Sequence, residues 1–521
     1  MDNVFRIVSL RAKPRVSKYV SSLGLISSAI FFSYGVQAND SELSYLEEMG
    51  KRLFFENISL NNNMSCSTCH TASTGGTNGD SDTNLVDVAV TGSDGVLVGA
   101  LKPPTNQYAQ FHNGAGGIEG LTNFDPNCPT FGGPAPCGGA FWNGRAEGDL
   151  IEKFHKIDLF GELRSKYETM YRKYLGPLAD QAHASPFINP LEQAKPTKIS
   201  VCEQVKKQLW GQQLYKYAFG TSLRCREQHI DKVFARFALA LSAWQMSSDN
   251  NRFDSKRDIA LKNDTDGAFP LDDFTDEENH GHDLFYGVGV PAAGARCFFC
   301  HQSGNDQGVG EFERYTNDEY FNIGVPRNHD IPNNPEPDVG LFAMTSVETH
   351  RGEHKVPTLR NVDKRPHASF VKAYTHNGWF KSLEDLVHFY NTSSVPVTPA
   401  QITACDNAST PAQKMAVSAA CFFGKTRCID NTLTSAEAIA ANCWPEPEID
   451  QNIPGFPVGN LRLNQDDEAA IVAYLKTLSD ESHVEVPQPY QLQPLDERRL
   501  EPQSHSESGV HSPQPRERHR R

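Results

Sequence analysis

A Cys-x-x-Cys-His run occurs twice in this chain, at residues 66–70 and at residues 297–301. This spacing is the attachment signature of c-type haem. Two thiols on one turn can each form a thioether with a haem vinyl group, and the adjacent imidazole then becomes an axial ligand of the iron. A zinc site, or a disulfide followed by a His, would use the same residue types. Because the pattern appears twice, we expect two covalently bound haems. The predicted attachment residues are Cys66, Cys69, Cys297 and Cys300, with His70 and His301 as axial ligands.

Residues 1–38 are typical of a secretory signal peptide. Five basic residues precede an apolar run from about Tyr19 to Tyr34, and small residues follow at residues 36–38. The run is short and contains five serines, which favours cleavage over a permanent membrane anchor. We therefore expect an exported protein that begins at Asn39 and has no membrane span after cleavage.

The net charge of the chain is −15, and removal of this leader, whose net charge is +4, leaves −19. An acidic surface argues against nucleic acid as a partner and favours a basic one.

Eight of the 12 Cys residues lie outside the haem motifs. Their even number and the oxidising compartment predict disulfides. The pairs Cys128–Cys137 and Cys202–Cys225 are plausible because each is local. The other four lie in one segment and are expected to pair among themselves, with connectivity left open: Cys405, Cys421, Cys428 and Cys443.

Helical apolar spacing precedes each haem motif. A Gly-x-x-Leu-Phe pattern begins at Gly50 and recurs at Gly281, and a further helical stretch runs from about residue 202 to residue 246. No strand alternation is strong enough to indicate a sheet core. The sequence therefore predicts a mainly α fold with two cytochrome c-like haem domains and long irregular loops.

This organisation predicts four regions along the chain. They are a signal peptide (1–38), an N-terminal haem domain (39–255), a C-terminal haem domain (256–484) with an irregular, Cys-containing insert at about 392–457, and a disordered tail (485–521).

In its motifs the chain resembles the bacterial di-haem cytochrome c peroxidases and their relative MauG, over roughly residues 45–390 and 460–480. The order and spacing of the motifs, more than any one of them, carry this resemblance. Besides the haem motifs they are residues 50–55, 141–145, 189–192, 355–361, 376–378 and 382–385.

The resemblance implies a role for each matching residue. His70 would ligate a peroxide-binding haem and His301 an electron-transfer haem. Trp142 matches the tryptophan that lies between the two haems, and Glu192 matches the distal carboxylate that moves protons at the peroxide site. Without the resemblance, this Trp and this Glu would be read as ordinary core and surface residues.

The second axial ligand of the electron-transfer haem departs from many relatives. Where they place a Met, this chain has Tyr390, as MauG does; His388 and Met344 are competing candidates. A phenolate oxygen is a hard donor that stabilises oxidised iron, whereas a thioether favours reduced iron. Tyr390 should therefore lower the potential of this haem.

Two other family features are altered. Relatives that rest inactive carry a His about 15 residues after the first motif, but the nearest His here is His112, so the first haem is expected to be open. The resemblance also implies Ca²⁺ between the domains. The family Asn falls near Tyr108, which leaves Asn106 or main-chain carbonyls as the candidate ligands.

The sequence thus predicts a periplasmic oxidoreductase of the cytochrome-c peroxidase type. It would reduce hydrogen peroxide to water with electrons from a small cytochrome c or copper protein, and a homodimer would be usual for the family. The alternatives are a MauG-like oxidase that modifies a partner protein, a non-enzymatic electron carrier, and a haem dioxygenase that cleaves a hydrophobic polymer. Glu192 argues against the carrier, because proton transfer to peroxide has no role there.

Overall fold

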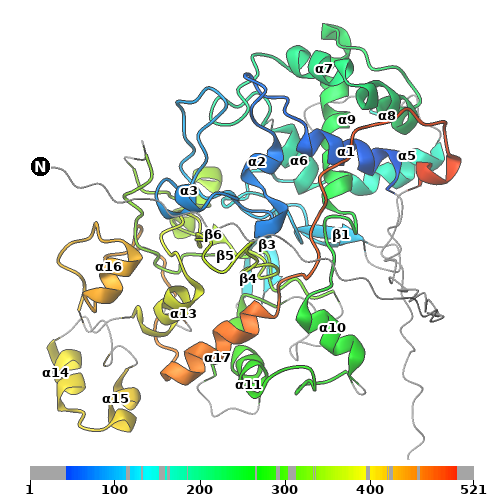
Figure 1. Cartoon of the computed structure of the whole chain (residues 1–521). Coiled ribbons are helices and arrows are strands. Elements are labelled where there is room, and N and C mark those ends of the chain that lie inside the picture. The colour runs from blue at the N-terminus through cyan, green and yellow to red at the C-terminus, as the bar shows by residue number, and fades with distance from the viewer. Residues whose placement is uncertain are drawn as a thin grey trace, which may run out of the picture. The chain divides into compact units, whose positions relative to one another are not determined.

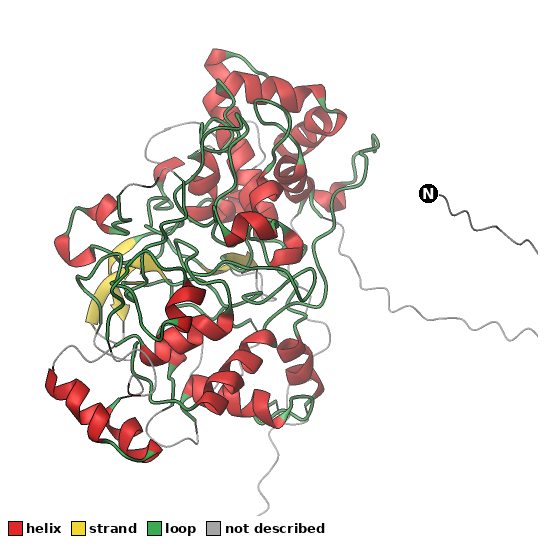
Figure 2. Ribbon diagram, turned by 60° about the vertical axis from the view of Figure 1, so that its left-hand side comes forward, coloured by secondary structure: helices red, strands yellow, loops and turns green. Residues whose placement is uncertain are grey.

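The structure is a computed structural model, and helices dominate it (Figures 1 and 2). It describes residues 43–501 except for short gaps at 113–117, 131–132, 152–158, 161–164, 185, 265–266, 289–293, 303–311, 333, 335, 395–398, 419–420, 422–425 and 455–457. The predicted signal peptide, residues 1–38, lies outside the described residues, as does the end of the predicted tail.

Each half of the chain is built on one pair of crossing helices. In the N-terminal half α1 (Tyr45–Phe55) packs against α9 (Glu227–Gln245), and in the C-terminal half α11 (Asp276–Tyr286) packs against α17 (Gln465–Lys476). Both leading helices begin with a capping box, in which the side chains of the cap residue and of a Glu three residues later satisfy free backbone N–H groups. This repeated pair is the arrangement expected of two cytochrome c-like domains.

A glycine lies at each helix crossing. A Cβ atom at Gly50 would lie 1.9 Å from the carbonyl oxygen of Ala240, and one at Gly281 would lie 2.0 Å from that of Ala470. Glycine therefore lets the two backbones approach closely, which explains why the Gly-x-x-Leu-Phe pattern occurs twice.

The other helices fill out the two halves. The N-terminal half also contains α2 (Cys66–Cys69), α3 (Ser81–Leu85), α5 (Ser165–Tyr171), α6 (Pro177–His183), α7 (Lys198–Lys207) and α8 (Leu209–Phe219). The C-terminal half also contains α10 (Lys256–Asn263), α12 (Phe342–Thr345), α13 (Leu383–Thr392), α14 (Pro399–Asn407), α15 (Pro411–Val417) and α16 (Ser435–Ala440). Short 3₁₀ turns are η1 (Ala72–Thr74), η2 (Arg172–Tyr174), η3 (Cys297–Phe299), η4 (Glu348–His350) and η6 (Glu497–Leu500).

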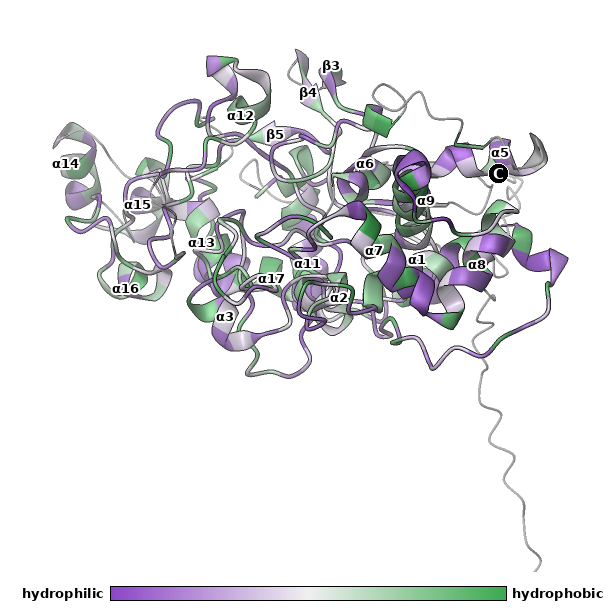
Figure 3. Cartoon of the chain, turned by 90° about the horizontal axis from the view of Figure 1, so that it is seen from above, coloured by the Kyte–Doolittle hydropathy of each residue, from purple (hydrophilic) through white to green (hydrophobic). Residues whose placement is uncertain are grey.

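Helical packing supplies the two main hydrophobic cores. The predicted stretch 202–246 is helical but divided among α7, α8 and α9, and the apolar residues of α9 are buried. In Figure 3, α1 and α8 carry both hydrophilic and hydrophobic residues, as helices at the edge of a core do. The second core is formed mainly by α11, α13 and α17.

Strands are few in the described residues and form only small antiparallel pairs. They are β1 (Gln110–His112) with β2 (Ile118–Gly120), β3 (Asp125–Thr130) with β4 (Gly133–Cys137), and β5 (Tyr320–Phe321) with β6 (His354–Lys355). The prediction of a mainly α fold without a sheet core is confirmed. None of the described helices is both long enough and apolar enough to cross a bilayer.

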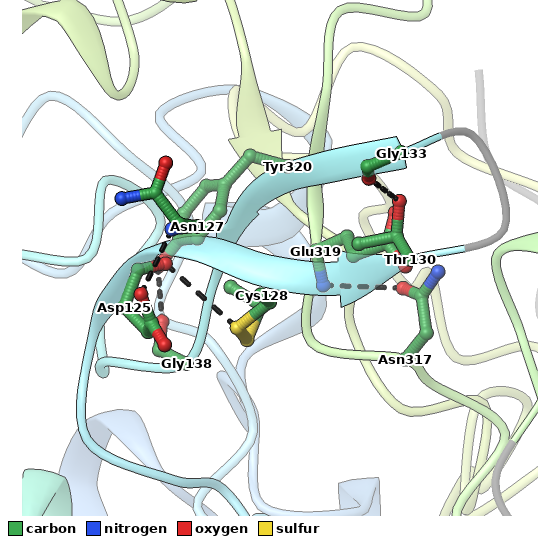
Figure 4. Close-up of a disulfide and its surroundings, with 10 residues drawn as sticks. Asp125, Asn127, Cys128, Thr130, Gly133, Gly138, Asn317, Glu319 and Tyr320 are labelled. Atoms are coloured by element: carbon green, nitrogen blue, oxygen red, sulfur yellow. Dashed lines mark hydrogen bonds between the residues drawn. A yellow bond between two sulfur atoms is a disulfide. The ribbon is translucent and has the colours of Figure 1, made fainter.

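The β3–β4 hairpin carries one of four disulfides (Figure 4). Cys128 and Cys137 are bonded within it, and the hairpin contacts the C-terminal half, because the hydroxyl of Tyr320 donates to the carbonyl of Gly138 at 2.5 Å. The Cys202–Cys225 pair is likewise confirmed. The last four cysteines do pair among themselves, as Cys405–Cys421 and Cys428–Cys443.

Two expectations about the C-terminal half need correction. The insert is not irregular throughout, since α14, α15 and α16 lie within residues 392–457 (Figure 1). Residues 485–501, expected to begin a disordered tail, instead contact the N-terminal half. Arg499 pairs with Glu48 of α1 at 2.5 Å, and the Tyr490 hydroxyl donates to Gln213 of α8 at 2.6 Å.

The helix crossings generate a test of stability. Replacing Gly281 with Ala should improve local helix propensity, yet the added methyl group meets the Ala470 carbonyl. We therefore expect Gly281→Ala to lower the free energy of unfolding by about 1–3 kcal/mol, measured by urea denaturation. Gly99→Ala is the control, since its Cβ would meet only the Ala89 methyl at 3.7 Å. Equal stability of both variants would contradict this account of the crossing.

Candidate active site

The first Cys-x-x-Cys-His motif forms α2, directly after α1. Cys66 and Cys69 are not disulfide-bonded, and burial raises the pKa of each thiol to about 12. The Nδ1 atom of His70 lies 3.0 Å from the carbonyl oxygen of Gly76. Since a carbonyl only accepts hydrogen bonds, Nδ1–H is the donor, and the lone pair of the neutral ring is on Nε2.

The second motif repeats this geometry. Cys297 begins the 3₁₀ turn η3, Cys300 caps its C-terminal end, and both thiols are again free. Nδ1 of His301 lies 3.0 Å from the carbonyl oxygen of Tyr315. Burial lowers the pKa of His70, and it lowers that of His301 to about 4. Both rings are therefore neutral, which is the form that ligates a metal.

A large cavity lies beside each motif. The first is lined by Cys66, Cys69 and His70, and the second by Cys297, Cys300 and His301. Both cavities are lined mainly by apolar surface together with the residues of the motif. Free thiols, a neutral imidazole with Nε2 available and an adjacent apolar cavity fit a c-type haem at both places.

Trp142 lies in the wall between the two cavities and lines both of them. Its indole Nε1–H donates to the carbonyl of Lys102 at 2.8 Å, which fixes the buried ring. The Lys102 side chain also lines both cavities, with Nζ 5.8 Å from the centre of the indole ring. Burial lowers the pKa of Lys102 to about 8.

Glu192 lines the first cavity, on the loop that precedes α7. Its carboxylate accepts a hydrogen bond from the Asn189 amide at 2.7 Å. Burial raises its pKa above the ordinary value, although the Asn189 amide and the charge of Arg145 partly offset this effect. A carboxyl group with a raised pKa beside an open cavity is suited to proton transfer near neutral pH.

Of the three candidates for the second axial ligand, Tyr390 is the one that lines the second cavity. Burial raises its pKa, and the nearby Cys300 and Cys297 act in the same direction. His388 instead directs Nδ1 to the carboxylate of Glu468 at 3.0 Å. Met344, on α12, does not line the cavity. At the first haem site, the side chain of His112, the His nearest to the first motif, lies outside the described set.

A group of four residues that the sequence did not single out as a site lies between the cavities. The rings of His354 and His376 stack with their centres 3.6 Å apart. Nε2 of His354 is 2.8 Å from Asp338, and Nε2 of His376 is 3.0 Å from Glu448. Asp338 lines the first cavity and both imidazoles line the second.

The carboxylates of this group are held ionised. Burial opposes ionisation of Asp338, but the hydrogen bond and charge of His354 keep its pKa well below the usual range. Glu448 also accepts bonds from the amide of Asn377 and the backbone N–H of Asp338, each at 3.0 Å. His376 lies in one of the motifs that carry the family resemblance. Glu448 lies in the insert, and no sequence motif marked it as a site residue.

The paired helix crossings and the two cavities, each with its Cys-x-x-Cys-His turn, define a protein with two cytochrome c-like domains. Residues 45–266 match the family model described as di-haem cytochrome c peroxidase. Over these residues the chain is similar to the family of di-haem peroxidases and MauG, whose members are oxidoreductases with two c-type haems.

Individual relatives agree with this family. The methylamine utilization protein MauG of Paracoccus denitrificans is 27% identical over 448 residues, which cover 84% of this chain and 88% of that protein. The cytochrome c551 peroxidase of Nitrosomonas europaea is 25% identical over 379 residues, which cover 71% and 82%. The crystal structure of the diheme peroxidase BthA from Burkholderia thailandensis superposes with a TM-score of 0.53 at 22% identity, covering 84% and 87% of the two chains, and so shares the fold.

Glu448 provides a test of the group between the cavities. Burial raises its pKa, but the hydrogen bond and charge of His376, together with the Asp338 N–H and the charge of His354, outweigh burial, so the folded-state pKa is lowered from 4.5. A carboxylate of this kind stabilises the fold above about pH 4.5 and loses its contribution as the pH falls further. We expect Glu448→Gln to lower the free energy of unfolding at pH 7 by about 1–3 kcal/mol.

The difference from the unmodified protein should shrink as the pH falls from about 4.5, as measured by urea denaturation across pH. The exposed Glu481→Gln serves as the control. A constant difference from pH 7 to pH 3 would contradict an ionised Glu448.

Proposed function

We propose that the protein is a periplasmic di-haem peroxidase that reduces hydrogen peroxide to water. The observation that carries this proposal is the presence of the half-buried Glu192 carboxylate in the same cavity as His70. Trp142 separates this cavity from a second one with its own Cys-x-x-Cys-His turn. A site for proton transfer and a route for electrons are therefore adjacent.

Cys66 and Cys69 would hold the first haem by thioether bonds with His70 as its axial ligand, and Cys297, Cys300 and His301 would hold the second. A bound haem supplies an iron that can take peroxide as a ligand and exchange electrons. The residues of the chain then supply the rest of the site.

Glu192 acts as the general acid–base at the peroxide. Its carboxylate takes the proton from one peroxide oxygen and delivers it to the other, so that the leaving oxygen departs as water and not as hydroxide. The Asn189 amide orients this carboxylate, and Arg145 lies near enough for its charge to favour the ionised form.

Tyr390 is the proposed second ligand at the electron-transfer site. A phenolate oxygen favours oxidised iron, so this site would retain an oxidising equivalent that Trp142 helps to transfer. The two electrons per peroxide would come from a small cytochrome c or copper protein, whose basic surface would suit the acidic chain. Export through the predicted signal peptide places this exchange in the periplasm, and a homodimer is the proposed assembly.

A MauG-like oxidase that modifies a partner protein is the second candidate. Two observations favour it: Tyr390 lines the second cavity, and MauG matches over 84% of the chain. The proposed haem sites are the same in both cases, and the electron source differs.

The test of the proposed function is to add peroxide to the fully oxidised protein and to follow haem absorbance by stopped flow. We expect a rapid change without prior reduction, and turnover once a small cytochrome c or cupredoxin is supplied. Glu192→Gln should slow the reaction with peroxide by roughly 10²–10⁴-fold. The rate of the reaction with peroxide should fall at low pH, with an apparent pKa above 4.5, because burial raises the pKa of Glu192. The Glu192→Gln variant should not show this fall.

Asn63→Asp is the control, because it changes the charge in the opposite direction at a residue that does not line the cavity. We expect this variant to react with peroxide at the rate of the unmodified protein. A Glu192→Gln rate within a few-fold of the unmodified rate would contradict the assigned role. Peroxide reactivity with no electron acceptance from any small redox protein would favour the MauG-like oxidase.

The second ligand is tested by Tyr390→Met. A thioether favours reduced iron, so the potential of one haem should rise by a sizeable part of the roughly 0.8 V range that axial ligands span. The measurement is a spectroscopic redox titration of both haems. His388→Gln is the matched control, because His388 pairs with Glu468 and should not affect the potential. A change in His388→Gln but not in Tyr390→Met would assign the ligand to His388.

A further inference from the structure

The side chain of Lys372 is buried where the two halves of the chain meet. Its ammonium donates to the backbone carbonyls of Thr74, Asn361 and Lys364, at 2.9, 2.8 and 3.1 Å. Only 3% of the residue is exposed. Thr74 belongs to the loop after the first Cys-x-x-Cys-His motif, whereas the other two carbonyls belong to the C-terminal half. Main-chain oxygens from both halves therefore surround one positive charge.

These contacts require the charged form of the side chain. An ammonium has three N–H donors and a neutral amine has two, so three carbonyl acceptors are satisfied only by the ammonium. Burial lowers the pKa of Lys372, and the charge of Lys102 acts in the same direction. The charge of Asp363 raises this pKa, whereas those of Arg365 and Lys364 lower it further. The three carbonyl groups accept hydrogen bonds from the ammonium and so favour the charged form.

The surroundings hold the three carbonyls in place. A Cβ atom at Gly75 would lie 2.7 Å from the carbonyl oxygen of Asn361 and 3.4 Å from Nζ of Lys372, so only glycine fits there. The side-chain amide of Asn361 donates to Gln107 and to Asp480, each at 2.9 Å. These three carbonyls, called the carbonyl cage below, are therefore positioned by the surrounding chain, and the space between them suits an ammonium group.

The same cage is a poor site for calcium. Ca²⁺ takes six to eight oxygen ligands at about 2.3–2.6 Å, usually including carboxylates. Within the described part of the chain, no group of three or more His, Cys, Asp and Glu residues is arranged to hold a metal. The Asn106 side-chain oxygen is buried without a hydrogen-bond partner among the described residues, but it is one neutral ligand. Tyr108, at the family's Asn position, uses its hydroxyl to bind Asp480.

We propose that the ammonium of Lys372 is the structural cation of this junction, and that the chain joins its two halves without bound Ca²⁺. A cation that is part of the chain cannot be removed by a chelator or lost by dilution. It also supports the first haem site, because the carbonyl of Gly76, two residues after Thr74, accepts the hydrogen bond that fixes His70. This inference is independent of the reaction that the protein catalyses.

The first test uses the intact protein with its haems attached. Metal analysis after exhaustive dialysis should find much less than one calcium per chain. The midpoint of thermal unfolding, followed by circular dichroism, should be the same in EDTA and in CaCl₂ to within about 1 °C, because a ligand that binds only the folded state would raise it. One tightly bound calcium per chain, or a midpoint that falls in EDTA and recovers in CaCl₂, would overturn the proposal.

The second test removes the charge with Lys372→Met. Three buried carbonyls then lose their donors, so we expect the unfolding midpoint to fall by roughly 3 °C or more. Lys381→Met is the matched control, because Lys381 donates to a single carbonyl, that of Asn84, at 2.7 Å. A Lys372→Met midpoint no lower than that of Lys381→Met would overturn the proposal. If Lys372→Met does not fold, the calcium measurements on the unmodified protein still decide.

Discussion

Two hydrogen bonds, each from the Nδ1 of a half-buried imidazole to a backbone carbonyl, determine where the chemistry of this protein can occur. They join His70 to Gly76 and His301 to Tyr315, both at 3.0 Å. Each bond fixes the tautomer, so that Nε2 is available to an iron. The helix pairs hold these turns in place: α1 and α11 are each followed, after ten residues, by a Cys-x-x-Cys-His motif. A close crossing at glycine is the geometric requirement that both halves share.

The sequence was sufficient for features that are local. The two motifs and the four disulfides each join residues at most 23 positions apart. Proximity in the sequence therefore predicted the motifs and the first two disulfides, and it limited the last four cysteines to pairing among themselves. The recurring glycine was visible as a pattern, but its contact with Ala240 or Ala470 was not. Tyr390 could be separated from His388 only in three dimensions, because both lie on α13 and the face each presents depends on what packs there. The family resemblance, not spacing, pointed to Trp142 and Glu192.

The buried lysine and the contact of residues 485–501, which the sequence did not predict, both depend on long-range contacts. Lys372 reaches a carbonyl 298 residues away, and no periodic pattern marks a lysine that will be buried. Such a charge would normally be expected on the surface, since burial removes its hydration. Only the three-dimensional position of the carbonyls of Thr74, Asn361 and Lys364 shows why burial is tolerated. The contact of residues 485–501 with α1 and α8 was missed for the same reason.

The final residues of the long insert between α13 and α17 show what the insert contributes to the structure. The Cys405–Cys421 disulfide closes a segment that contains the end of α14 and all of α15, and Cys428–Cys443 closes one that contains α16. Both bonds restrict the unfolded chain and lower the entropy cost of such an insertion. The insert ends by bringing Glu448 to His376, next to the wall that separates the two cavities. Because the stacked His354 is paired in turn with Asp338 at the first cavity, the insert contributes charge to the region between the cavities. An insertion at this position therefore alters the electrostatics between the two proposed haem sites and leaves their Cys-x-x-Cys-His turns unchanged.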